Sequence, residues 1–92
     1  MTHNATGQAD AVGQRTLDIL REVTGEHEVL ADPDLPLYTS GLLDSLATVT
    51  LMVAFEEAFG LTISPAEFDK EAWATPRAVV ADIERRLETQ QA

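Results

Sequence analysis

The stretch Gly41-Leu42-Leu43-Asp44-Ser45-Leu46 opens an apolar run that continues to Phe59 and is followed by Gly60. An Asp-Ser step ahead of apolar residues is typical of a helix start, because a side-chain oxygen there accepts from backbone N–H groups that lack a partner. Glycine directly after the last apolar residue is a typical helix stop. The stretch therefore predicts a helix over residues 45–59.

The apolar residues of this helix occupy almost its whole circumference, which is more than one buried stripe needs. Part of the helix is therefore expected to expose apolar surface beside its acidic residues. Such a surface indicates a docking face for partner proteins, although each apolar residue can instead belong to the core of a small bundle. The residues expected at the docking face are Leu43, Asp44, Leu46, Val49, Met52, Glu56 and Glu57.

Three further helices are predicted from periodicity and terminal signals. Apolar residues recur near helical spacing between Asp10 and Val23, with Gly25 as a stop. Ser64-Pro65 starts a short helix that ends near Glu71, and Thr75-Pro76 starts a last helix that ends near Glu88. The fold class is all-α: a small four-helix bundle with three long helices and one short one.

A long loop, residues 26–40, separates the first two helices and contains prolines and aspartates that disfavour regular structure. Its apolar residues are expected to be tucked against the domain: Leu30, Leu35, Leu37 and Tyr38. Residues 61–63 are likewise expected to form a tucked loop. We expect a disordered start over residues 1–9, one domain over residues 10–88 and a frayed end over residues 89–92.

Composition excludes several functions for this 92-residue chain. Sixteen acidic against six basic residues give a net charge of −10, which disfavours binding to nucleic acid and to anionic membranes. The chain has no cysteine, so any thioester chemistry needs a thiol from elsewhere. No metal-ligand cluster, secretory signal or membrane-spanning run is evident, and we expect a cytoplasmic protein.

Ser45 has several interpretations. It can belong to a helix cap with Asp44, or it can present its hydroxyl where the helix start favours an anion such as a phosphodiester. A catalytic serine is disfavoured, because the chain lacks Gly-x-Ser-x-Gly and its histidines, His3 and His27, lie in segments without predicted structure. Ser45 can still be the acceptor for an external transferase.

Residues 41–49 and 55–61 closely resemble the Asp-Ser-Leu segment of acyl and peptidyl carrier proteins, and the likeness extends from about Asp10 to Leu87. The resemblance implies a four-helix bundle without catalytic residues of its own. It implies that Ser45 receives 4′-phosphopantetheine from coenzyme A through a phosphopantetheinyl transferase. The terminal thiol of this arm then holds an acyl or aminoacyl group as a thioester.

Residues 67–76 and 41–45 look like D-alanyl carrier proteins and related amino-acid carriers. Ala47 and Thr50 stand where fatty-acid carriers commonly have acidic residues, which predicts a less charged docking face. Five of the six basic residues are Arg and alanine is abundant, as expected from a GC-rich genome, whereas teichoic acid D-alanylation is typical of low-GC bacteria. We therefore first expect a discrete carrier for polyketide or nonribosomal biosynthesis. The alternative is a D-alanyl carrier in teichoic acid D-alanylation. A different class, a structural or regulatory helical interaction module, would use Ser45 only as a cap.

The implied partners are an adenylating enzyme, an acyltransferase or both, and a downstream synthase. A carrier that meets several enzymes should bind each of them weakly through a small interface. We therefore expect a monomer that forms transient complexes.

Overall fold

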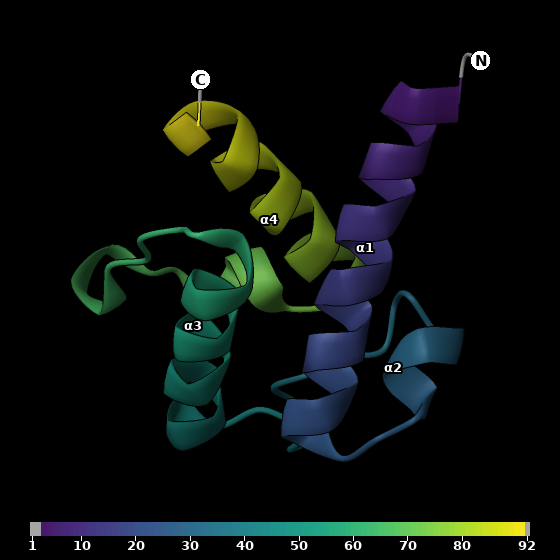
Figure 1. The fold of residues 1–92 in the computed structure, drawn as a ribbon. Helices are drawn as coiled ribbons and strands as arrows, with labels where there is room; N and C mark the ends of the chain where they lie inside the picture. The colour runs from purple at the N-terminus through teal and green to yellow at the C-terminus, as the bar shows by residue number, and fades with distance from the viewer. Residues whose placement is uncertain (1–2, 92) are drawn as a thin grey trace.

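The computed structural model describes the backbone of residues 3–91 and the side chains of residues 11–66 and 68–90. Within residues 3–91 the elements are helical and none is a strand, which confirms the all-α fold (Figure 1). In chain order they are α1 (His3–Thr24), α2 (Glu28–Ala31), α3 (Ser45–Phe59), the 3₁₀ turns η1 (Pro65–Glu67) and η2 (Lys70–Trp73), and α4 (Pro76–Gln91).

Helix α1 is the centre of the bundle and contacts each of the other α-helices. Helices α2 and α3 lie on opposite sides of α1, and α4 runs obliquely from beside α1 to a position above α3 (Figure 1). The segment from residue 32 to residue 44 crosses from the α2 side of α1 to the α3 side (Figure 1). It therefore delivers the chain to the start of α3.

Helix α3 has the predicted bounds, whereas the first and last helices are longer than predicted. Helix α1 begins at His3, so residues 3–9 are helical where an irregular segment was expected, and residues 1 and 2 lie outside the described part. Extending a formed helix costs little, so no local start signal is needed at Asp10. Helix α4 ends at Gln91, past the predicted end near Glu88.

The predicted short helix over residues 65–71 is wrong in detail, because two 3₁₀ turns replace it. Phe68 is extended (φ −79°, ψ 135°), and its ring packs against Trp73 with the ring centroids 4.5 Å apart. The Asp69 carboxylate then accepts from the Glu71 amide at 3.0 Å and starts the second turn. Burial of Phe68 against Trp73 thus interrupts the helix that Pro65 begins.

Trp73 is fully buried and meets Phe55 of α3 edge to face, with the ring centroids 5.4 Å apart. Leu61 and Ile63 are also buried, as expected for a tucked loop. The segment predicted as a long loop, residues 26–40, contains the helix α2 and is only partly tucked in. Leu37 is fully buried, but Leu30 is 36% exposed, which corrects the expectation for that residue.

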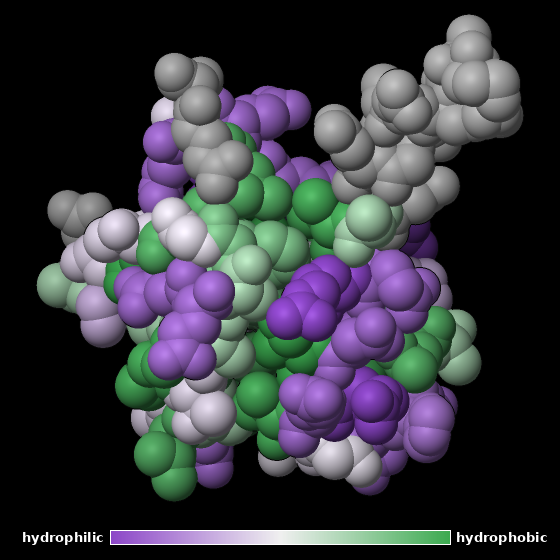
Figure 2. Space-filling model, viewed as in Figure 1, coloured by the Kyte–Doolittle hydropathy of each residue, from purple (hydrophilic) through white to green (hydrophobic). Residues whose placement is uncertain are grey.

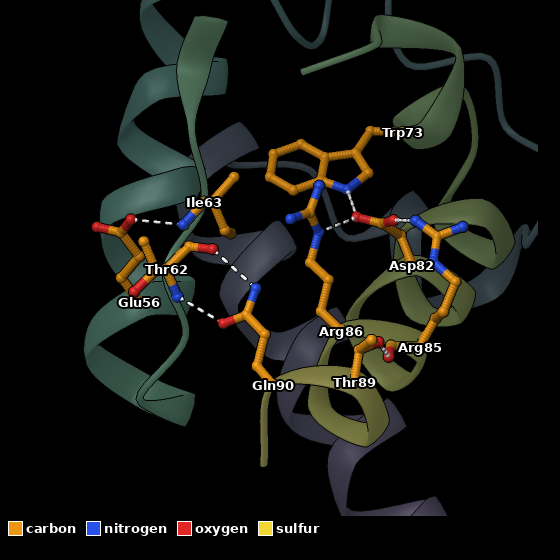
Figure 3. A network of polar contacts seen from close by, with 9 residues as sticks. All are labelled: Glu56, Thr62, Ile63, Trp73, Asp82, Arg85, Arg86, Thr89 and Gln90. Atoms are coloured by element: carbon orange, nitrogen blue, oxygen red, sulfur yellow. Dashed lines mark hydrogen bonds and ion pairs between the residues drawn. The ribbon is translucent and has the colours of Figure 1, made fainter. Parts of the chain in front are cut away.

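A buried carboxylate joins η2 to α4 (Figure 3). Asp82 is 3% exposed and accepts from Trp73 Nε1 at 2.8 Å and from Arg86 Nε at 2.7 Å. Arg85 pairs with the other carboxylate oxygen. Every hydrogen-bonding atom of this carboxylate is therefore used, as burial of a charge requires.

The segment after α3 is fixed by side chains from two helices (Figure 3). Glu56 of α3 accepts from the Ile63 amide at 2.8 Å. The Gln90 side-chain amide both accepts from the Thr62 amide and donates to the Thr62 carbonyl, each at 2.9 Å. Gln90 therefore ties the end of α4 to the loop, where the sequence predicted a frayed terminus.

Candidate functional site

Ser45 is the first residue of α3 and is exposed, and Asp44 caps the helix. The Asp44 carboxylate accepts from the Ala47 amide at 2.8 Å. The Asp44 carbonyl accepts from the Thr48 amide at 2.9 Å. Within the described part of the chain, the amides of Ser45 and Leu46 have no acceptor. The helix start therefore has both a hydroxyl and unpaired N–H groups at the surface, the arrangement that favours an anion.

The Ser45 hydroxyl has no activating base among the described side chains, since no hydrogen bond joins it to any of them. His27 lies exposed at the start of α2, and the side chain of His3 is outside the described part. No group of His, Asp and Glu within the described residues could hold a metal ion. None of the described side chains is therefore placed to activate Ser45 as a nucleophile.

A second contact holds the chain that leads into this helix start. The Tyr38 hydroxyl lies 2.6 Å from Thr48 Oγ1, and the Lys70 ammonium lies 5.4 Å from the centre of the Tyr38 ring. Burial raises the pKa of Tyr38. Sequence reasoning assigned Tyr38 only to packing, because nothing in the local pattern pairs it with Thr48.

The exposed face of α3 differs from the predicted docking face. Its apolar stripe consists of Leu46 (76% exposed) with Val49 and Val53 (48% each), which follow one another at helical spacing. Leu43 and Met52 are only 2% and 4% exposed, so the prediction that they lie at the docking surface is wrong. Figure 2 shows hydrophobic residues on the α3 side of the molecule, beside a hydrophilic area over the lower part of α1.

The two glutamates near the end of α3 have different surroundings. Glu57 is exposed, whereas Glu56 is half-buried and holds the Ile63 amide. Glu57 and Asp44 are therefore the carboxylates that border the apolar stripe at the surface.

A cavity of about 350 Å³ lies away from this face, between α1, α2 and α4. Its apolar lining includes Leu17, Val29 and Val80, and α3 contributes no lining residue. Ser45 is therefore on an open surface, not beside this hollow. Among the described residues, no helix has the length and apolar character to cross a bilayer.

Fold and site together define a class of protein: a small helical bundle that exposes, at the start of a helix, a serine hydroxyl without an activating base among the described side chains. Comparison with known families supports the same class. The family described as phosphopantetheine attachment site matches residues 14–83.

Three curated relatives are all named D-alanyl carrier protein. The one from Enterococcus faecalis is 40% identical over 73 residues, which cover 79% of this chain and 94% of that protein. The one from Bacillus velezensis is 46% identical over 67 residues (73% and 86%). The one from Lacticaseibacillus casei is 38% identical over 76 residues (83% and 94%).

The chain belongs to the phosphopantetheine-binding carrier family. Its prosthetic group is 4′-phosphopantetheine, and it is a carrier, not an enzyme. It works with a phosphopantetheinyl transferase and with enzymes that load and unload the arm. The relatives do not support the first expectation of polyketide or nonribosomal biosynthesis, and they favour the alternative of a D-alanyl carrier.

Proposed function

We propose that this chain is a D-alanyl carrier whose phosphopantetheine arm is attached to Ser45. The observation that carries the proposal is the exposed Ser45 hydroxyl at the start of α3, which no described side chain binds, inside the segment that matches the family. The unpaired amides of Ser45 and Leu46 suit the negative charge of a phosphodiester. The names of the relatives support D-alanine as the cargo.

Attachment forms one bond and breaks one. Ser45 Oγ attacks the pantetheine-bearing phosphorus of coenzyme A, and the bond from that phosphorus to adenosine 3′,5′-bisphosphate breaks. The hydroxyl proton passes to a base of the transferase, because no described side chain of this protein accepts it. This chain contributes the nucleophilic oxygen and a helix start that favours the product's charge.

The cargo is held by the arm and not by a side chain. Because the chain has no cysteine, the only thiol available for a thioester is the one at the end of phosphopantetheine. An adenylating enzyme would activate the D-alanine carboxyl group and transfer it to this thiol. A downstream transferase would then pass the D-alanyl group to its acceptor.

We place partner docking on the apolar stripe of Leu46, Val49 and Val53, bordered by Asp44 and Glu57. Helix α3 carries no basic residue, so a partner with an apolar patch and flanking Arg or Lys is complementary to it. Ala47 and Thr50 add no charge to this face. We therefore expect a partner to dock mainly by apolar contact, with the two carboxylates at the border of the interface.

The attachment is tested by incubating the protein with coenzyme A and a phosphopantetheinyl transferase and measuring intact mass. Wild type should gain the mass of one phosphopantetheinyl group, and Ser45→Ala should gain nothing. Ser40→Ala and Ser64→Ala, at other exposed serines, are matched controls and should be modified like wild type. Equal modification of Ser45→Ala and wild type would overturn the assignment.

The cargo is tested separately on the modified protein with a D-alanine-adenylating ligase, ATP and either D-alanine or L-alanine. We expect a D-alanyl adduct that hydroxylamine removes, as it removes thioesters. A carrier that accepts the arm but never D-alanine would contradict the cargo and leave the attachment site standing.

A further inference from the structure

We propose that Tyr38 and Thr48 are positioning residues for Ser45, acting through a hydrogen-bond chain from the long loop to the first turn of α3. The inference rests on the proposed attachment at Ser45. It assigns a task to two residues that do not belong to the apolar stripe.

The direction of these hydrogen bonds follows from the number of protons that each group can donate. Thr48 Oγ1 lies 2.7 Å from the Asp44 carbonyl oxygen, which can only accept, so the Thr48 proton points to Asp44. A threonine hydroxyl has one proton, and therefore the Tyr38 hydroxyl, 2.6 Å away, must donate to Thr48 Oγ1. The chain runs from Tyr38 through Thr48 to Asp44, and each bond polarises the next.

The loop that carries Tyr38, where this hydrogen-bond chain begins, is itself held in place. The Gly41 amide donates to the Tyr38 carbonyl at 3.1 Å, and the Leu43 amide donates to the Leu37 carbonyl at 2.9 Å. Gly41 has φ +86°, a conformation that side-chain-bearing residues rarely adopt, so a glycine is needed for this closure. Residues 37–43 thus form a closed turn that ends directly before Asp44.

Burial and packing hold the same turn against the domain. Leu37 is fully buried and its amide donates to the Ala74 carbonyl at 2.9 Å. Lys70 of η2 lies over the ring of Tyr38. Tyr38 therefore projects its hydroxyl from a turn that is held in place. The hydrogen bond from this hydroxyl to Thr48 connects that turn to α3.

The first turn of a helix is where fraying begins, because its amides lack intrahelical acceptors. Ser45 lies in this turn, one residue after the carbonyl on which the chain ends. A Ser45 Oγ that is held in one direction accepts the phosphopantetheinyl group faster than one that samples many directions, since the transfer requires a narrow approach geometry. Docking at the apolar stripe does not depend on these two hydrogen bonds. Loss of either hydrogen bond should thus lower kcat of the phosphopantetheine transfer and leave KM unchanged.

The test compares Tyr38→Phe, which keeps the ring, with Thr48→Val and Thr48→Ser, which remove and keep the hydroxyl. Hydrogen exchange of the Ala47 and Thr48 amides is measured by NMR, with the Phe59 amide at the other end of α3 as internal reference. Intact-mass assays give kcat and KM of phosphopantetheine transfer. Thr16→Val is the matched control, because the Thr16 hydroxyl donates to the Val12 carbonyl within α1.

Tyr38→Phe and Thr48→Val should each speed exchange of the first-turn amides about fivefold, with Phe59 unchanged, as expected for one lost hydrogen bond. They should lower kcat several-fold at constant KM. Thr48→Ser and Thr16→Val should match wild type in kcat and in exchange at the first turn.

Three results would overturn the positioning role: wild-type kcat and first-turn exchange in both variants, a change in KM alone, or equal acceleration at Phe59. If Tyr38→Phe does not fold, the Thr48→Val and Thr48→Ser pair decides the question. A wild-type protein that takes up no phosphopantetheine contradicts the proposed function instead, so the two failures are distinguishable.

Discussion

Asp44 and Ser45 are neighbours with different tasks. Asp44 turns both its carboxylate and its carbonyl toward α3, where they accept from Ala47 and Thr48. Ser45 leaves its hydroxyl exposed and unpaired within the described part of the chain. A cap of this kind contributes about 1 kcal/mol to stability. The capping interpretation and the acceptor interpretation are therefore compatible, because they concern different residues.

Tyr38 is the only tyrosine of the chain, so its ionisation can be followed without interference from another phenol. Burial raises its pKa above the ordinary value of about 10. A raised pKa means that the neutral phenol stabilises the fold below the pKa of the unfolded chain. This stabilisation is lost as pH rises through the folded pKa.

We therefore expect phenolate absorbance to appear at higher pH in the native protein than in urea. Above about pH 10, wild type should lose stability relative to Tyr38→Phe, which has no group that ionises there in place of Tyr38. Denaturation curves of both proteins at pH 8 and above pH 10 provide the measurement. A native titration that coincides with the urea titration would contradict the effect of burial.

At the scale of the elements, α3 could be predicted to the residue because both of its ends are determined locally. Asp44 caps the start, and Gly60 takes a left-handed conformation (φ +69°) at the stop. The break between η1 and η2 could not be predicted, because it depends on Phe68 reaching Trp73. The length of α1 was missed because continuation of a helix has no local signal.

The two apolar sides of α3 predict opposite effects of truncation. Met52→Ala, in the core, should cost about 2–5 kcal/mol of stability, whereas Leu46→Ala, on the exposed stripe, should change stability by less than about 0.5 kcal/mol. Leu46→Ala should instead raise KM for the phosphopantetheinyl transferase. Urea denaturation followed by Trp73 fluorescence and transfer kinetics give the two readings. The reverse pattern would exclude Leu46 from the docking face.

At the scale of the whole molecule, Asp82 joins segments that packing alone would hold less tightly. Its carboxylate accepts from the Trp73 indole of η2 and from Arg86 of α4. The burial of this network has no sequence signature, because an acidic residue amid helix positions ordinarily indicates a solvated face. Only the packing of η2 on α4 buries it.

We expect Asp82→Ala to cost about 2–4 kcal/mol, because it leaves a buried indole N–H and a mostly buried guanidinium without their acceptor. Asp34→Ala, which breaks the exposed pair with Arg77, should leave the midpoint of unfolding almost unchanged. Urea denaturation of both variants, followed by Trp73 fluorescence, compares them. A loss of stability in Asp34→Ala as large as in Asp82→Ala would contradict the role of burial.

The sequence by itself determined the helical class, the bounds of α3, the candidate serine at its start and the need for a thiol from outside the chain. These depend on local capping, glycine conformation and composition, which act over a few residues. Only the tertiary structure decided which side of α3 is exposed, because its apolar residues surround the helix almost evenly. Packing on α1 and Trp73 buries Leu51, Met52 and Phe55 and leaves Leu46, Val49 and Val53 at the surface beside Ser45. The contact of Tyr38 with Thr48 was decided in the same way, since it requires the loop to fold back onto α3.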